Sequence, residues 1–98
     1  MITSKQRSYL RSLANNMNPI FNVGKDGIQE AFIKQVDDAL EARELIKISV
    51  LNNSGFKARE ASDILCEALN CQGVQAIGNK LVLYRKSSKN PKIEFPEP

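Results

Sequence analysis

Residues 22 to 32 of this chain read NVGKDGIQEAF, and this stretch decides the fold. The apolar residues just before and within it, over 20–23, predict a short β-strand. Gly24 and Gly27 then bracket a turn, and apolar residues at helical spacing follow to about Arg43. A strand that leads through a glycine turn into a helix begins a strand-helix-strand unit, which is typical of layered α/β folds.

The rest of the chain extends this pattern on both sides. Thr3 and Gln6 form a capping-box pattern ahead of a helical apolar stripe, which predicts a first helix from residue 4 to about 15. Helical spacing predicts two more helices, over about 28–43 and 57–70. Alternating or short apolar runs predict further strands over 45–51, 74–77 and 81–85.

The predicted order of elements is therefore α-β-α-β-α-β-β. Strand-helix-strand units imply some parallel pairing, whereas Gly78-Asn79 suits a two-residue hairpin turn and implies an antiparallel edge. We predict a single α/β domain with a four-stranded mixed sheet over residues 1–86. A polar, proline-containing tail over 87–98 is expected to be frayed or packed as an extended arm.

Composition narrows the class of protein. The chain has 98 residues, of which 42% are hydrophobic and 26% charged, as in ordinary globular domains. No window approaches the 18 consecutive apolar residues of a membrane span, and the N-terminal sequence MITSKQRSYL lacks the apolar core of a signal peptide. We expect no membrane association and a cytoplasmic location.

The residue inventory does not favour catalysis or metal binding. The chain has no histidine to act as a general base, and Cys66 and Cys71 alone do not complete a zinc site. We expect the two cysteines to be reduced, structural thiols. Helical spacing places Asp37, Asp38 and Glu41 together on what is expected to be a solvent-facing side.

A nucleotide-binding P-loop is also excluded. That motif needs a glycine five residues before Gly24 and a serine or threonine after Lys25, and the chain has Pro19 and Asp26 at these positions. We therefore predict that the protein is not an enzyme and needs no cofactor or metal.

Charge is distributed unevenly along the chain. Carboxylates are concentrated in 37–44 and 60–67. Basic residues occupy the two acid-free segments, before Asp26 and over 79–92, and include Lys5, Arg7, Arg11, Lys25, Arg85 and Lys86. Such segregation predicts a basic face for an anionic partner and an acidic back.

The glycine loop allows two interpretations. In one, it is only a turn, with Asp26 as the N-cap of the next helix and Gln29 completing a capping box. In the other, its backbone N–H groups hold an RNA phosphate, as a GXXG loop does in KH domains, with Lys25 at the tip. The basic first helix and basic last strand favour a nucleic-acid binder. Because aromatic residues are few, recognition of the backbone and shape of structured RNA is favoured over base stacking.

The chain resembles the CRM domain, the chloroplast RNA splicing and ribosome maturation module, in its stand-alone bacterial YhbY-type form. The resemblance runs from about Thr3 to Arg85. It is carried by four ordered segments, SKQRSYLRSLAN, PIFNVGKDGI, ALEARELIKISVL and VQAIGNKLVLYR.

This resemblance implies a fold similar to the C-terminal domain of translation initiation factor 3. It also implies RNA binding without catalysis, in association with precursors of the large ribosomal subunit. The GxxG loop of the family maps onto Gly24, Lys25, Asp26 and Gly27, and its basic first-helix residues map onto Lys5, Arg7 and Arg11. Asp26 departs from the small or neutral residue often found there, and it would repel phosphate if its carboxylate pointed outward.

The sequence therefore predicts a monomeric, non-enzymatic RNA-binding protein that assists large-subunit assembly. The loop 24–27 is expected to contact the RNA backbone, and the phosphate-binding residues are expected to be Lys25, Lys5, Arg7, Arg11, Arg85 and Lys86. The alternative is a protein-protein adaptor, which would need an exposed apolar patch around Phe56 or Phe95.

Overall fold

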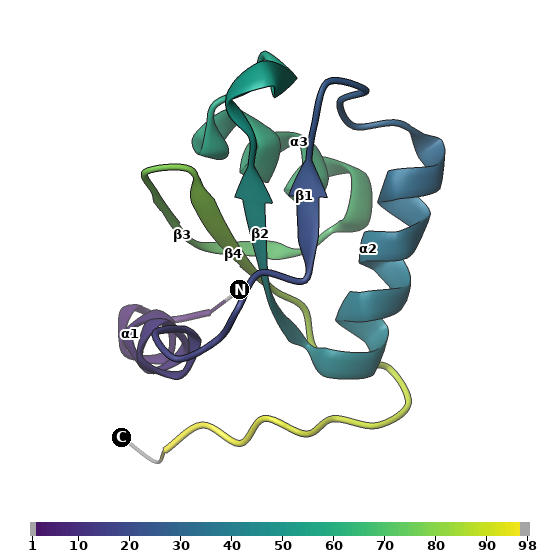
Figure 1. Cartoon of the computed structure of the whole chain (residues 1–98). Coiled ribbons are helices and arrows are strands. Elements are labelled where there is room, and N and C mark those ends of the chain that lie inside the picture. The colour runs from purple at the N-terminus through teal and green to yellow at the C-terminus, as the bar shows by residue number, and fades with distance from the viewer. Residues whose placement is uncertain (1, 97–98) are drawn as a thin grey trace.

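A computed structural model describes residues 2–96 of the chain. The elements follow the predicted order, and their bounds are α1 Ser4–Ala14, β1 Phe21–Val23, α2 Glu30–Arg43, β2 Leu45–Val50, a short 3-10 turn η1 Asn52–Ser54, α3 Ala58–Leu69, β3 Gln72–Ile77 and β4 Lys80–Tyr84. The prediction of a single α/β domain is confirmed (Figure 1).

The four strands form one mixed sheet in the order β1-β2-β4-β3. β1 pairs in parallel with β2, while β4 pairs antiparallel with both β2 and β3. The hairpin between β3 and β4 turns at Gly78-Asn79 as predicted, with Gly78 at a φ of 59°. β1 and β2 both run toward the end of the sheet that carries the glycine loop, which we call the loop end.

The sheet is covered on both faces. Alternate residues of each strand point to opposite faces, so Ile46, Ile48 and Val50 pack under α2 and α3, with Leu81 and Leu83 beside them. Leu45, Val82 and Tyr84 point to the other face. Figure 1 shows α1 on one side of the sheet and α2 on the other.

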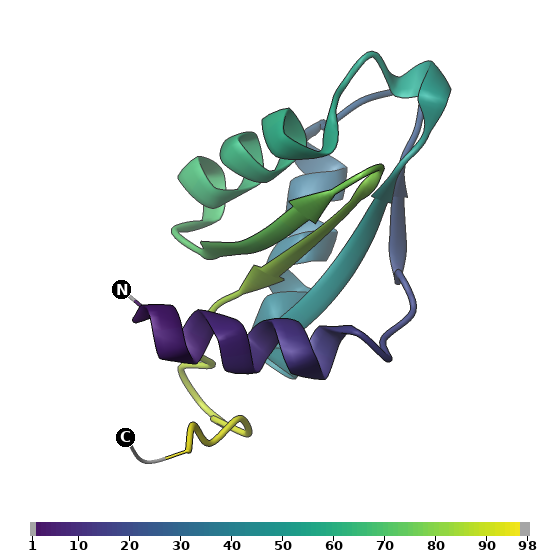
Figure 2. The same cartoon turned by 90° about the vertical axis from the view of Figure 1, so that its left-hand side faces the viewer.

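Helix α1 covers only part of its face. Its Leu10 and Ala14 are buried against Leu45, Val74 and Val82. Figure 2 faces this side and shows α1 crossing the sheet near the end opposite the loop end, with the strands continuing beyond it without a helix in front. The start of α1 is fixed by the predicted capping box, since Gln6 N donates to Thr3 Oγ1 at 3.1 Å and Thr3 N donates to Gln6 Oε1 at 2.9 Å.

The C-terminal segment packs as an extended arm on the end of the sheet opposite the loop. Ile93 and Phe95 join the apolar cluster under α1, where the Phe95 ring meets the rings of Tyr9 and Tyr84 edge to face. The arm thereby lies against both α1 and the end of β4.

Two carboxylates fasten this arm. Glu44 is fully buried and accepts backbone N–H bonds from three tail residues, Ser87, Lys92 and Ile93, at 2.6–2.8 Å. Glu41 accepts the Ser87 hydroxyl at 2.6 Å, together with bonds from Ser88 and Lys89. The expectation that Glu41 lies on a solvent-facing side is only partly correct, because Glu41 is partly buried by the arm, which supplies donors that helical spacing alone does not reveal.

Both glutamates have a lowered pKa. The bond from the Ser87 hydroxyl, reinforced by bonds from Ser88 and Lys89, lowers the pKa of Glu41 to about 2. Burial on its own raises the pKa of Glu44, but the three backbone donors and the nearby charge of Lys86 outweigh it and leave the pKa below its usual value. Both side chains are therefore held as carboxylates at neutral pH.

Candidate nucleic-acid interface

The glycine loop is a closed turn at the loop end of the sheet. Gly27 N donates to Gly24 O at 3.0 Å, and Gly27 adopts a φ of 73°, a conformation that favours glycine. A Cβ on Gly27 would also lie 3.3 Å from Phe56 Cε2. Gly24 differs, because its φ is not positive and a Cβ there would meet only Leu51 Cδ1 at an ordinary 3.8 Å. The fold thus requires glycine at 27 but not at 24.

Asp26 does not cap the following helix. Helix α2 begins at Glu30 with Gln29 as its N-cap, and the Gln29 side chain donates to the backbone O of Asp26 at 3.0 Å. The predicted capping box at Asp26 is therefore wrong, since the chain needs Ile28 and Gln29 to turn from the loop into the helix. The Asp26 side chain is exposed.

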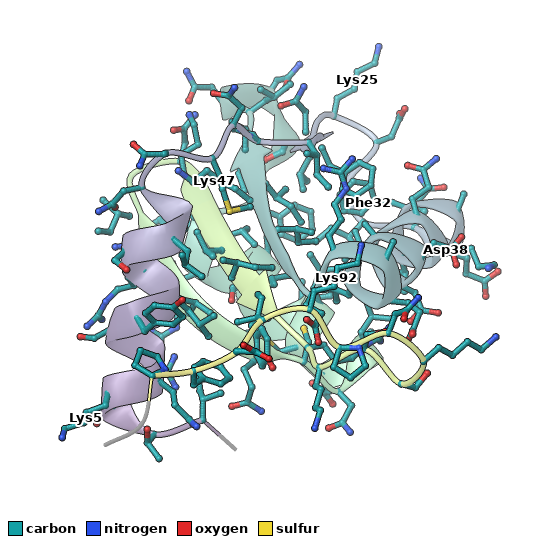
Figure 3. The ribbon with its side chains drawn as sticks, turned by 90° about the horizontal axis from the view of Figure 1, so that it is seen from below. Lys5, Lys25, Phe32, Asp38, Lys47 and Lys92 are labelled. Carbon is teal, nitrogen blue, oxygen red and sulfur yellow. The ribbon has the colours of Figure 1, made fainter. Side chains whose placement is uncertain are left out.

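A shallow cleft lies beside the turn. It has a volume of about 440 Å³ and is lined by the loop residues, by Asn22 and Gln29, and by Phe32 and Gln35 of α2. Lys25 is exposed, and Figure 3 shows its side chain pointing away from the body of the protein. The loop therefore offers a projecting cation next to a hollow of mixed polar and apolar lining.

The arginines of α1 lie on one flank of the helix. Tyr9 faces the C-terminal arm through Phe95. At about 100° per residue, Arg7 and Arg11 fall on the opposite flank, toward the uncovered part of the sheet. Arg7 donates to the backbone O of Gly73 at the start of β3, which fixes the direction of its guanidinium group.

Lys5 lies elsewhere on the same helix. It is exposed, and its helical position is on the outer side, away from the sheet. Figure 3 shows Lys5 projecting from one side of the view and Lys25 from the other. The three predicted basic residues of the first helix are thus not equivalent.

Two lysines of the sheet join the arginines on the uncovered face. The register pairs Lys47 with Val82, which is buried under α1, and Lys80 with Ser49, so both lysines point to the α1 face. Both are partly exposed. Neither lysine is among the site residues predicted from the sequence. The signal was available, because Lys47 alternates with the apolar residues of its strand.

We call the uncovered part of the α1 side of the sheet the open sheet face. It lies between α1 and the loop end (Figure 2). Its basic residues are Arg7, Arg11, Lys47 and Lys80.

Acidic side chains gather on the opposite side. Helices α2 and α3 carry seven of the eleven acidic residues of the chain, namely Glu30, Asp37, Asp38, Glu41, Glu60, Asp63 and Glu67. The charge segregation seen along the sequence is therefore also a segregation between the two faces of the sheet. Such a distribution orients a polyanion toward the α1 side.

Arg85 and Lys86 lie at the other end of the molecule from the glycine loop. They follow β4, which runs antiparallel to β2 and ends beside the C-terminal arm. Arg85 Nη1 is 2.7 Å from Asp37 Oδ1, and its guanidinium also donates to the backbone O of Leu69 and of Asp37. Much of the donor capacity of Arg85 is thus used within the protein, whereas Lys86 is exposed.

The aromatic residues named for an adaptor surface are engaged internally. Phe56 packs against the core under α2 and α3, and Phe95 packs under α1. Both rings are partly buried, and neither is among the large apolar side chains that are exposed within residues 2–96.

Within residues 2–96 there is also no group of three or more potential ligands of the His, Cys, Asp and Glu types that could hold a metal ion. No helix in this range is long and apolar enough to cross a membrane.

Comparisons with known proteins give a consistent result. The model of the CRS1 / YhbY (CRM) domain family matches residues 2–85. "Probable RNA-binding protein YqeI" of Bacillus subtilis is 48% identical over 98% of this chain and 100% of its own length. A Haemophilus influenzae protein named "RNA-binding protein" is 33% identical over 97% of this chain and 95% of its own.

A solved structure agrees with the fold. The solution structure of a hypothetical protein from Staphylococcus aureus superposes with a TM-score of 0.76. It is 48% identical to this chain and covers 98% of it, and all of that chain is matched. The relatives are named as RNA-binding proteins and not as enzymes. The family match over nearly the whole chain, together with the shared fold, shows that this protein belongs to the CRS1 / YhbY (CRM) domain family.

Proposed function

We propose that this protein binds RNA without catalysis, through the glycine loop and the open sheet face, and that its target is large-subunit ribosomal RNA or a precursor particle. The observation that carries the proposal is the position of Arg7, Arg11, Lys47 and Lys80 on one acid-poor surface beside the loop. The RNA-binding names of its relatives and the family match support the same function. We further propose that it acts as a cytoplasmic monomer.

The proposed contacts fall into two groups. At the loop, the chain can approach an RNA backbone closely because Gly24 carries no side chain, and Lys25 adds a charge at the tip. On the open sheet face, lysine and arginine side chains bind phosphates while β2 and β4 hold their spacing. A structured RNA is the favoured target, because the chain has few aromatic residues on which single-stranded bases could stack.

Three of the predicted basic residues lie outside the RNA path from the loop across the open sheet face. Lys5 projects from the outer side of α1, and Lys86 lies beside the arm, so neither faces the path. Arg85 serves mainly to join the end of β4 to α2 through Asp37.

The test is binding to large-subunit ribosomal RNA over a salt series, comparing wild type with Lys25→Ala. Lys34→Ala is the matched control, because Lys34 is an exposed lysine on α2, where it pairs with Asp38 at 3.0 Å. We expect Lys25→Ala to weaken binding and to flatten the salt dependence by about 0.7 log units of affinity per log unit of salt. Lys34→Ala should behave as wild type.

Two outcomes would contradict the proposal. Equal binding by all three proteins would show that the loop is only a turn. Equal affinity for small-subunit and large-subunit ribosomal RNA would be consistent with RNA binding but would contradict the proposed large-subunit target.

A further inference from the structure

The two cysteines lie against each other at the junction of α3 and β3. Cys71 Sγ is 3.7 Å from Cys66 Sγ, and Cys71 N donates to Cys66 O at 3.3 Å. The backbone bond holds the two residues together across the end of the helix, where Asn70 turns the chain with a φ of 53°. Both cysteines are free thiols. A disulfide needs a sulfur-sulfur distance of about 2.05 Å, so the sulfurs would have to approach by roughly 1.7 Å.

The two thiols differ in exposure. Cys71 is only 6% exposed, whereas Cys66 is partly exposed. Both line a cleft of about 370 Å³ at the outer edge of β3, together with Arg7, Arg59, Ser62 and Gly73. A small oxidant in this cleft therefore meets Cys66 first, with Cys71 directly behind it.

The surroundings of Cys66 favour its ionised form. The hydrogen bond from Cys71 lowers the pKa of Cys66 to about 7, aided by Ser62 and by the charge of Arg7. The same contact, together with burial, raises the pKa of Cys71. An accessible sulfur with thiolate character next to a protonated neighbour is the arrangement of an attacking and a resolving cysteine.

We propose that Cys66 and Cys71 form a redox pair that peroxide closes to an intramolecular disulfide. In the first step the Cys66 sulfur attacks hydrogen peroxide, so that an S–O bond forms, the O–O bond breaks and hydroxide leaves. Hydroxide then takes the Cys71 proton and becomes water. The Cys71 sulfur attacks the Cys66 sulfur, so that the S–S bond forms, the S–O bond breaks and a second hydroxide leaves. That hydroxide takes up the proton that Cys66 released to solvent when it ionised. In total two thiols are oxidised and one peroxide is reduced to two waters. A dithiol reductant then reduces the disulfide back to the two thiols.

The disulfide would form on the α3 side of the edge strand β3, and it would lie close to Arg7. Gly73 lies two residues after Cys71, and its backbone O accepts the bond from Arg7. A Cβ placed on Gly73 would be 3.7 Å from Cys66 Sγ, so the Cys66 sulfur lies near the start of β3.

The experiment treats the folded, reduced full-length protein with hydrogen peroxide, alkylates the remaining thiols under denaturing conditions and identifies the products by mass spectrometry. The tryptic peptide 60–80 contains both cysteines. We expect this peptide to lose two hydrogens and to carry no alkyl group, and we expect dithiothreitol to restore both thiols. Cys71→Ser should instead accumulate sulfenic acid at Cys66, trapped by dimedone.

The Cys66→Ser variant tests the order of the two steps. Because Cys71 is buried, its oxidation in this variant should be slower than in wild type by more than about tenfold. The proposal is overturned if wild type accumulates sulfinic acid at Cys66 while Cys71 stays alkylatable, or if it forms only disulfides between molecules. It is also overturned if Cys71 reacts equally fast without Cys66. Sulfinic acid at Cys66 and disulfides between molecules are both measured on the wild-type protein, so these two tests do not depend on whether a variant folds.

Discussion

The polar groups at the two ends of the sheet have different partners, at the loop end and at the opposite end, which carries the C-terminal arm and which we call the tail end. At the tail end, two carboxylates accept bonds from five residues of the C-terminal arm, and Arg85 is joined to Asp37 and Leu69. At the loop end, the turn is closed by one backbone bond and one bond from Gln29, while Lys25 and Asp26 are exposed. Polar groups at the tail end therefore stabilise the fold, and those at the loop end remain available to a partner.

This comparison predicts that substitutions at the two ends affect different measurements. Changes at the tail end should lower stability with little effect on RNA affinity of the folded protein. Changes at the loop end and on the open sheet face should lower RNA affinity while the free energy of unfolding stays close to wild type.

The largest expected effect is that of Glu44→Ala. The substitution leaves three backbone N–H groups without their acceptor in a buried site, so the free energy of unfolding should fall by about 3–5 kcal/mol. Urea denaturation measures this. Glu67→Ala, an exposed glutamate of α3, is the control and should change stability by less than about 0.5 kcal/mol. Equal stability of the two variants would contradict a structural role for the arm.

Acid should release the same arm. Glu41 has a pKa of about 2 in the folded protein against a usual value of 4.5, and the pKa of Glu44 is also lowered. A lowered folded-state pKa gives stability that is fully present above the unfolded value and is lost as pH falls through the folded value. The melting temperature should therefore be steady above about pH 5 and should fall between about pH 4.5 and 2.

Ser87→Ala sharpens this acid prediction. It removes the hydroxyl that contributes most to the low pKa of Glu41, so that pKa should rise toward 4.5. The acid-dependent loss of stability should become smaller in this variant. A melting temperature that does not change between pH 4.5 and 2 in wild type would contradict the role of the carboxylates.

The two glycines of the loop are expected to affect different properties. Gly27 should matter for the stability of the fold, and Gly24 should matter for RNA binding. Gly27→Ala forces a side chain into a φ of 73° and toward the Phe56 ring, which should cost about 1–2 kcal/mol of stability. Gly24→Ala meets only an ordinary contact with Leu51, so stability should stay within about 0.5 kcal/mol of wild type.

Gly24→Ala should lower RNA affinity although it hardly changes stability. If an RNA backbone approaches Gly24 closely, the added methyl group weakens binding although the fold is intact. Denaturation and RNA titration of the same two variants provide the test. Unchanged RNA affinity in Gly24→Ala would place the RNA away from the first glycine of the loop.

Much of the fold could be predicted from the sequence because its signals are local. The capping box at Thr3 and Gln6, the alternation over 45–50 and the glycine in the β3–β4 turn depend on residues close together in the chain. The start of α2 was predicted too early, because Asp26 has the chemistry of an N-cap but the turn still has to be completed by Ile28 and Gln29.

The site was harder to predict because its members are far apart in the sequence. Nothing near Arg85 in the chain indicates that Asp37 binds its guanidinium, since the two residues meet only when β4 and α2 are in place. The alternation of its strand indicates that Lys47 points away from Ile46 and Ile48. That α1 covers part of this face of the sheet, and that Lys80 lies on it too, depends on the register of the whole sheet. The buried Glu44 gave no local signal either, because its donors lie more than forty residues away.

The smallest expected effect concerns the two sides of α1. Arg11 lies on the flank toward the open sheet face, and Lys5 lies on the outer side, so the two residues share a helix and a charge but differ in direction. Arg11→Ala should remove one phosphate contact and reduce the slope of log affinity against log salt by about 0.7.

Lys5→Ala is the matched control for this last prediction. It removes the same charge from the same helix, so a general effect of net charge would lower the affinity of both variants equally. A specific path across the open sheet face would leave Lys5→Ala with the wild-type slope. Titrations at three or more salt concentrations separate these cases. If the slope falls for Lys5→Ala and not for Arg11→Ala, the RNA passes over the outer side of α1, and the open sheet face has some other use.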